Sequence, residues 1–79
     1  MAKITGKVAQ IIGPVIDVEF ASGSDLPKIY DSLEITKKDG SILVLEVQSH
    51  IGENIVRTIS MDSTDGLSRG VDVVASGAP

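Results

Sequence analysis

The chain of 79 residues has no cysteine, no tryptophan and only two aromatic residues, Phe20 and Tyr30. Without cysteine it can form neither a disulfide framework nor a thiolate metal site, which is typical of a reducing compartment. Lysine and arginine number seven against eleven acidic residues, giving a net charge of -4. A nucleic-acid-binding barrel needs a basic groove and stacking aromatics. We therefore expect no nucleic-acid partner.

Long apolar runs are also missing. The longest continuous aliphatic run extends from Ile42 to Leu45, far short of the roughly 20 residues that a membrane-spanning helix requires. At the N-terminus, Thr5, Gly6 and Lys7 interrupt the stretch in which a signal peptide would place its apolar segment. We expect a cytoplasmic chain that is not inserted directly into a membrane.

The apolar residues that are present alternate with polar ones. In the segment from Val15 to Phe20, the apolar residues share one face and Asp17 and Glu19 share the other, where we expect solvated carboxylates. Similar patterns predict six strands, over residues 4–12, 15–20, 33–36, 42–48, 55–61 and 71–75. A chain this short, with six short strands, favours an all-β fold, a small closed six-stranded antiparallel β-barrel without free edges.

Turn signals separate the predicted strands. The residues expected to form turns are Gly13, Pro14, Asp39, Gly40, Asp65, Gly66 and Gly70. A bulge near Ala9 and Gln10 would let Val8 and Ile11 both face inward. In the loops, we expect Leu26, Ile29 and Tyr30 to pack back onto the barrel, Leu67 to close one end of it, and Asp65 to accept local backbone hydrogen bonds. The barrel should cover residues 1–75, and residues 76–79 should begin a linker.

Catalytic and metal-binding patterns are not found. The sequence has no Gly-x-x-x-x-Gly-Lys-Ser/Thr phosphate loop. His50 is the only histidine, so a zinc site would have to consist mostly of carboxylates, and we expect a solvated or strand-end histidine. Ser60, Ser63 and Thr64 lack a nearby base for a catalytic triad. We assign no catalytic, cofactor-binding or metal-binding residue.

An ordered series of segments nevertheless resembles a known family. They are Gly6-Lys7-Val8, Ile11 to Val18, Leu26 to Tyr30 with Leu33, Leu45-Glu46-Val47, His50-Ile51-Gly52, Val56 to Met61, and Thr64 to Gly70. This series is similar to the N-terminal β-barrel domain of the catalytic β subunit of the rotary proton-translocating ATP synthase, over nearly the whole chain. Residues 76–79 resemble the exit of that barrel toward a nucleotide-binding domain.

The resemblance implies a structural role. Barrels of this family pack beside the corresponding domains of α subunits in an alternating hexameric ring, which holds the catalytic headpiece together. The resemblance implies that ATP or ADP and magnesium bind elsewhere in the parent β subunit, so no cofactor is expected here. The parent complex would be peripheral, on the cytoplasmic side of its membrane, and would couple ATP synthesis to hydrogen ion transport.

The contact surface is a separate hypothesis, because the interior has no room for every aliphatic residue. Candidates for the ring contact are Ile11, Ile12, Ile51, Ile55, Arg57 and Arg69. Core packing is the alternative for each aliphatic, and Arg69 would pair with a carboxylate on another domain or subunit. A different function, as a stand-alone lipoyl or biotinyl carrier or an adaptor, would use Lys37 or Lys38 at a hairpin tip.

Overall fold

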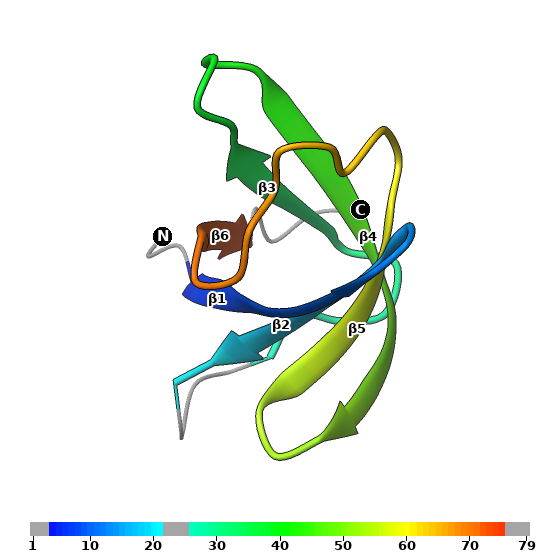
Figure 1. The fold of residues 1–79 in the computed structure, drawn as a ribbon. Helices are drawn as coiled ribbons and strands as arrows, with labels where there is room; N and C mark the ends of the chain where they lie inside the picture. The colour runs from blue at the N-terminus through cyan, green and yellow to red at the C-terminus, as the bar shows by residue number, and fades with distance from the viewer. Residues whose placement is uncertain (1–3, 22–25, 76–79) are drawn as a thin grey trace.

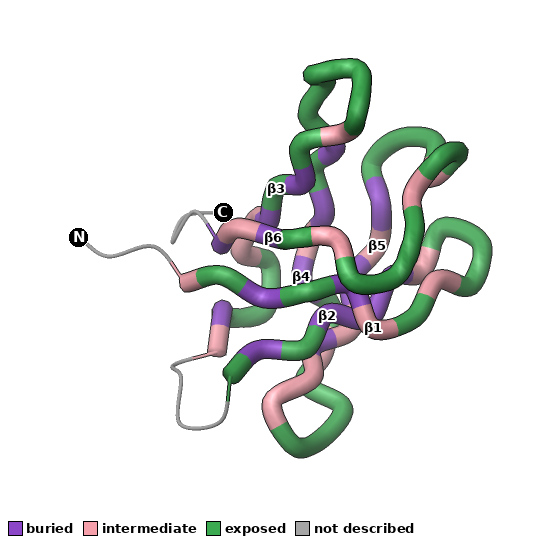
Figure 2. The backbone as a smooth tube through the Cα atoms, turned by 60° about the vertical axis from the view of Figure 1, so that its left-hand side comes forward, coloured by how far each residue is buried: buried purple, intermediate pink, exposed green. Residues whose placement is uncertain are grey.

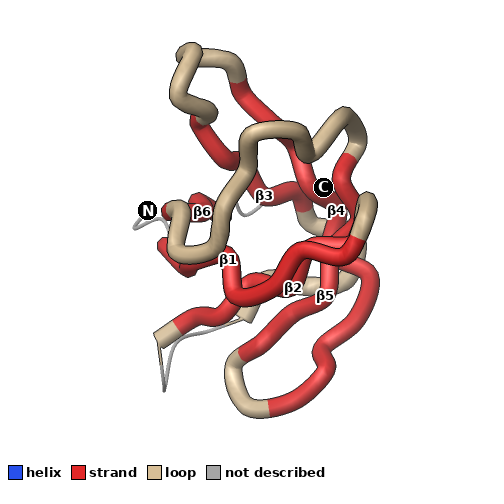
Figure 3. The backbone as a smooth tube through the Cα atoms, in the orientation of Figure 1, coloured by secondary structure: helices blue, strands red, loops and turns tan. Residues whose placement is uncertain are grey.

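The structure, a computed structural model, describes residues 4–21 and 26–75, and its regular elements are all β-strands (Figure 3). The strands are β1 (Ile4–Ile12), β2 (Val15–Phe20), β3 (Ser32–Thr36), β4 (Ile42–Gly52), β5 (Ile55–Ser60) and β6 (Asp72–Ala75). Their order around the sheet is β1-β2-β5-β4-β3-β6, and the sheet closes on itself through antiparallel pairs. The predicted six-stranded antiparallel barrel is confirmed (Figure 1).

The core follows from the alternation of the strands. Every second side chain points inward, and Figure 2 shows buried positions alternating with exposed ones along the strands. The inward apolar residues, all at most 5% exposed, are Val8, Ile16, Val18, Phe20, Leu33, Ile35, Leu43, Leu45, Val47, Val56, Val73 and Ala75. Branched aliphatic side chains dominate this set, as is typical of a narrow barrel interior.

The start of β1 is shaped by close packing against β2. The predicted bulge is confirmed, because the register of β1 on β2 shifts between Val8 and Gln10. Ile11 consequently packs against the core. Gly6 lies opposite Phe20, and a Cβ atom there would lie 2.9 Å from the Phe20 ring and 2.8 Å from the Glu19 carbonyl oxygen. Only glycine fits this approach without displacing β2.

β4 is longer than the sequence predicts. It was expected to end at Gln48 and instead continues to Gly52. Register shifts between Val47 and Ser49, and between His50 and Gly52, keep it paired with β5 where strict alternation stops. Such irregularities let a strand continue past polar residues. The turn into β5 is correspondingly tight, with Asn54 at a φ of 66°.

The connection between β2 and β3 differs from expectation at two residues. Leu26 packs against the core as predicted, but Ile29 and Tyr30 are 50% and 65% exposed, so the prediction that they pack back was wrong. The Tyr30 N–H donates to the Val47 carbonyl at 2.8 Å, with a φ of 73°. This backbone bond holds the turn close to β4. Pro27 is the buried residue of the turn.

The loop between β5 and β6 crosses one end of the barrel (Figure 1). Leu67 packs against the core from this loop, as predicted. Hydrogen bonds tie the loop to both neighbouring turns: Lys37 Nζ donates to the Ser63 carbonyl at 3.1 Å, and Thr64 Oγ1 donates to the Gly13 carbonyl at 3.3 Å. The loop therefore closes this end of the barrel. The predicted linker at 76–79 lies outside the described residues.

Candidate functional site

A charged pair on the outer face connects β2 and β5. Asp17 was expected to be a solvated carboxylate, and this was wrong, because the residue is only 5% exposed. Arg57 lies directly opposite it in the register. Arg57 Nε donates to Asp17 Oδ1 at 2.9 Å and Arg57 Nη2 to Asp17 Oδ2 at 3.1 Å. The guanidinium therefore covers the carboxylate in the two-bond geometry that arginine favours.

This pair leaves part of Arg57 available. The side chain is 42% exposed, and its hydrogen bonds and charge interaction with Asp17 raise the pKa of the guanidinium. Of its N–H donors, those on Nε and Nη2 serve Asp17. The remaining donors on the exposed part of the fork can still contact a carboxylate or carbonyl from outside the barrel.

The predicted contact residues occupy different environments. Ile12 and Ile51 are 56% and 43% exposed, and Arg69 is exposed too. Ile11 packs against the core and Ile55 is half-buried. The six predicted residues therefore differ in how far their side chains are exposed.

Besides Ile29 and Tyr30, three exposed large apolar residues were not among the predicted contacts. Met61 is 55% exposed, Ile42 52% and Val44 37%. Ile42 and Val44 alternate with the inward residues Leu43 and Leu45, so the sequence could have identified them as outward. Met61 follows the last residue of β5, where no alternation marks it.

These residues form part of a larger patch, which we call the outer apolar stripe. In the register, Ile12 lies opposite Val15 and Val15 opposite Ile59, while the Met61 N–H donates to the Val44 carbonyl at 3.0 Å. These contacts place outward apolar side chains side by side across β1, β2, β5 and β4. The stripe consists of Ile12, Val15, Ile42, Val44, Ile59 and Met61.

The predicted turn residues lie in turns or irregular segments. Positive φ angles occur at Gly13, Gly40, Gly66 and Gly70, and Pro14 follows the first of them. The Asp39 carboxylate accepts from the Ser41 N–H at 2.9 Å and from Ser41 Oγ at 2.6 Å. These bonds lower the pKa of Asp39. At Asp65, the observed bond is from its own N–H to Ser63 Oγ, at 3.1 Å.

Side chains that could do chemistry are engaged in local structure. His50 lies exposed near the end of β4, and its Nε2–H donates to the Pro27 carbonyl at 2.7 Å. Ser60 Oγ donates to the Asp62 carbonyl. Within residues 4–21 and 26–75, no group of three or more acidic, histidine or cysteine residues could hold a metal ion. These side chains hold turns in place.

The same described residues contain no helix long and apolar enough to cross a membrane.

The sequence of the chain matches a known protein family. Residues 8–77, almost the entire chain, match the family described as ATP synthase alpha/beta family, beta-barrel domain. The matched segment runs from the core residue Val8 on β1 past the last strand, so it includes β2 to β6. The chain therefore belongs to the ATP synthase alpha/beta family and carries the β-barrel domain of that family.

Proposed function

We propose that this chain is a non-catalytic assembly domain of the β-subunit type, which packs beside α-type barrels in an alternating ring. The observation that carries the proposal is the outer apolar stripe. A barrel of this size hides its apolar side chains inside, yet Met61, Ile12 and Ile42 are each more than half exposed. Contiguous exposed apolar patches mark protein–protein contact sites.

Charge gives the contact its orientation. Arg57 lies on the outer face of β5 between the half-buried Ile55 and Ile59, with guanidinium donors that Asp17 does not use. A carboxylate of the neighbouring barrel would complete this fork, and Arg69 would serve a second one. Rim charges of this kind select the partner and its register more than they add affinity.

The remaining parts of the proposal concern the parent subunit. We place the binding of ATP or ADP and magnesium, and the catalysis of ATP synthesis coupled to hydrogen ion transport, on chain beyond this barrel. The linker would begin at residues 76–79. The complex would be peripheral, on the cytoplasmic side of its membrane. In the alternative carrier function, Lys37 would have to swing freely, whereas its Nζ is bonded to the Ser63 carbonyl.

Ring assembly tests this proposal. We would co-express the parent β-type subunit with its α-type partner and measure the hexamer by native mass spectrometry. Val44→Asp with Met61→Asp should reduce the hexamer at least about tenfold, since each buried charge costs more than 1 kcal/mol. Thr5→Asp, an exposed position on β1 outside the stripe, is the control. Full assembly of the double variant would refute the contact.

A second test concerns catalysis. Isothermal titration of the 79-residue chain with ATP and magnesium should show no saturable heat, because no phosphate loop is present in the sequence. Stoichiometric binding at micromolar concentration would contradict the non-catalytic assignment.

A further inference from the structure

Within the part of the chain that the structure describes, β3 and β6 pair at two positions on each strand. Leu33 lies opposite Ala75 and Glu34 opposite Val74, and the pairing of the two strands ends there. Both strands continue beyond this point, β3 to Thr36 and β6 back to Asp72. The barrel therefore has a seam between β3 and β6 that is closed at one end and open at the other.

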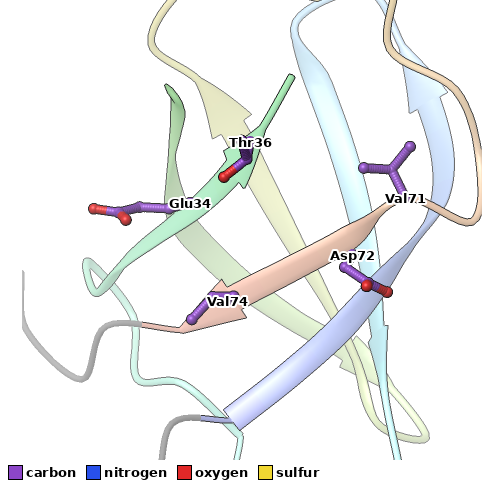
Figure 4. Close-up of a pocket in the computed structure, with 5 residues that line it drawn as sticks. All are labelled: Glu34, Thr36, Val71, Asp72 and Val74. Atoms are coloured by element: carbon purple, nitrogen blue, oxygen red, sulfur yellow. The ribbon is translucent and has the colours of Figure 1, made fainter. Parts of the chain in front are cut away.

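The open end coincides with a hollow. Figure 4 shows the two strands with the hollow between them, lined by Glu34, Thr36, Val71, Asp72 and Val74. Its volume is about 540 Å³, within the range of sites that bind small ligands or short peptide segments. Thr36 and Val71 also line a smaller hollow of about 60 Å³ beneath Leu67 at the barrel end. The two hollows therefore share two lining residues, and the smaller one is also lined by Leu67 and Ser68 of the loop that covers the barrel.

Backbone groups face this hollow. Along an antiparallel strand, consecutive residues direct their N–H and C=O groups to opposite sides. The Lys37 N–H donates to Ser41 of the hairpin partner and the Val47 N–H to Asp31, so the odd-numbered residues of β3 bond to β4. The backbone N–H and C=O groups of Thr36 therefore point toward β6.

The same reasoning applies to β6. The Val8 N–H donates to the Val71 carbonyl, so the odd-numbered residues of β6 bond to β1 and the groups of Asp72 point toward β3. Beyond Glu34 and Val74, Ile35 would lie opposite Val73, and Thr36 with Asp72 would be the next hydrogen-bonded pair, but the strands do not pair at either position. Two sets of backbone donors and acceptors consequently border the open seam.

The charges at the seam are acidic. The described residues contain two ion pairs, Lys7 with Asp72 and Arg57 with Asp17, and Glu34 belongs to neither. Glu34 lies exposed on the outer face beside Val74. The Lys7–Asp72 pair is itself about two-thirds exposed on both sides, so it holds Asp72 weakly. A cationic side chain from another molecule could pair with the free carboxylate of Glu34 or replace Lys7 at the carboxylate of Asp72.

We propose that the open end of the β3–β6 seam binds a short extended segment of another polypeptide, which pairs with the backbone at Thr36 and Asp72 and places a lysine or arginine beside Glu34. Addition of a strand to an exposed sheet edge is a recurring mode of peptide recognition. The unpaired stretch of β3, Ile35 and Thr36, accommodates about two residues at 3.3 Å each. Because β3 and β6 are antiparallel, the segment runs parallel to one of them and antiparallel to the other.

A second copy of this chain is a poorer occupant. Its own seam carries Glu34 and Asp72, and two such edges would bring like charges together. The site also differs from the proposed ring contact, because the seam offers backbone groups and carboxylates whereas the outer apolar stripe offers aliphatic side chains. The inference therefore does not depend on ring assembly.

A peptide titration followed by NMR tests the site. The probe is the capped pentapeptide Thr-Val-Arg-Val-Thr, added to the ¹⁵N-labelled 79-residue chain. Amide resonances of residues 34–37 and 71–74 should shift and saturate at millimolar peptide, because a short exposed contact is weak. A peptide with glutamate in place of arginine should bind more weakly, and N-methylation of both valines should abolish the shifts by removing backbone donors.

Two protein variants complete the test. Glu34→Gln should weaken binding of the arginine peptide about two- to fivefold, the range of an exposed ion pair. Glu19→Gln, an exposed carboxylate on β2, should leave binding unchanged. Absence of shifts at the seam, or equal binding of the N-methylated peptide, would overturn the proposal. Equal binding of the glutamate peptide would overturn its basic specificity.

Discussion

Two seams on opposite sides of the barrel are built differently. In the order β1-β2-β5-β4-β3-β6, the junction of β2 with β5 lies opposite the junction of β3 with β6. The first joins five residue pairs and carries the covered Asp17–Arg57 ion pair. The second joins two residue pairs among the described residues, stops short of Thr36 and Asp72, and has an exposed ion pair, Lys7–Asp72, at its margin. A closed barrel can therefore contain one seam that is extensively paired and another that is paired over a short stretch.

The difference teaches where the barrel can open. Proteins open locally where few backbone bonds and apolar contacts must be broken. Both strands of the β2–β5 seam carry core side chains along their paired length, whereas the β3–β6 seam borders a hollow of about 540 Å³. Opening should begin at the β3–β6 seam, and the following measurements test this order.

Hydrogen exchange should show the largest contrast. The Thr58 amide lies in β5 between two paired strands, so its exchange should require global unfolding. The amides of Thr36 and Asp72 face the open seam and should exchange nearly unprotected. For a domain of this size, the rates should differ by at least about a thousandfold. Comparable protection at Thr36 and Thr58 would show that the β3–β6 seam is closed in solution.

Truncation of Leu33 should break the weak seam. Leu33 is fully buried and lies opposite Ala75 of β6. Leu33→Ala should reduce the free energy of unfolding by about 3 kcal/mol, measured by urea denaturation. Hydrogen exchange in β6 should also accelerate more than exchange in β5.

Ile16→Ala provides the matched comparison, because Ile16 is equally buried on β2. Its loss of stability should be similar, but exchange in β6 should not accelerate selectively. Selective opening of β6 in both variants would mean that the effect reflects global stability alone.

Removing the carboxylate of each ion pair in turn should show that the two pairs contribute differently to the free energy of unfolding. Asp17→Ala should lower the free energy of unfolding by about 1 to 2 kcal/mol, because two hydrogen bonds to a covered carboxylate are lost. Asp72→Ala should change it by less than about 0.5 kcal/mol, since exposed pairs contribute little. Thermal denaturation of both variants decides the comparison, and an equal loss would contradict it.

Lowering the pH should have the smallest effect on stability. This effect arises in the hairpin between β3 and β4, which forms one side of the β3–β6 seam. Hydrogen bonds from Ser41 lower the pKa of Asp39 below its ordinary value of 3.8. Their stabilisation is therefore present above about pH 4 and disappears as the pH falls through the folded-state pKa. Between pH 5 and pH 2, Ser41→Ala should lose less stability than the original chain. Identical pH dependence of the two would contradict this role.

The sequence predicted the barrel because alternation records which face of a strand each side chain occupies. All six strands and the bulge near Ala9 follow from it. Alternation does not record which strands are neighbours, so the pairing that covers Asp17 with Arg57 was not foreseen. The continuation of β4 to Gly52 was missed because bulges suspend the alternation there.

The candidate contact surface was harder to predict for a related reason. Ile11 and Ile12 are adjacent aliphatic residues, and only the position of the bulge determines that Ile11 packs inward. Val44 was not among the predicted contacts, although its place between the inward residues Leu43 and Leu45 directs it outward. The open seam depends on where two distant strands separate, and no local pattern in β3 or β6 encodes it.

The position of β6 has a consequence for how the barrel forms. This strand of four residues pairs with β1 at Ile4–Ala75 and with β3 at Leu33–Ala75, so it completes two junctions in one step. Closure thus joins segments separated by almost the full chain length. Such non-local contacts form more slowly than local structure does. During synthesis, the first five strands must wait with two unsatisfied edges until residue 75 has left the ribosome.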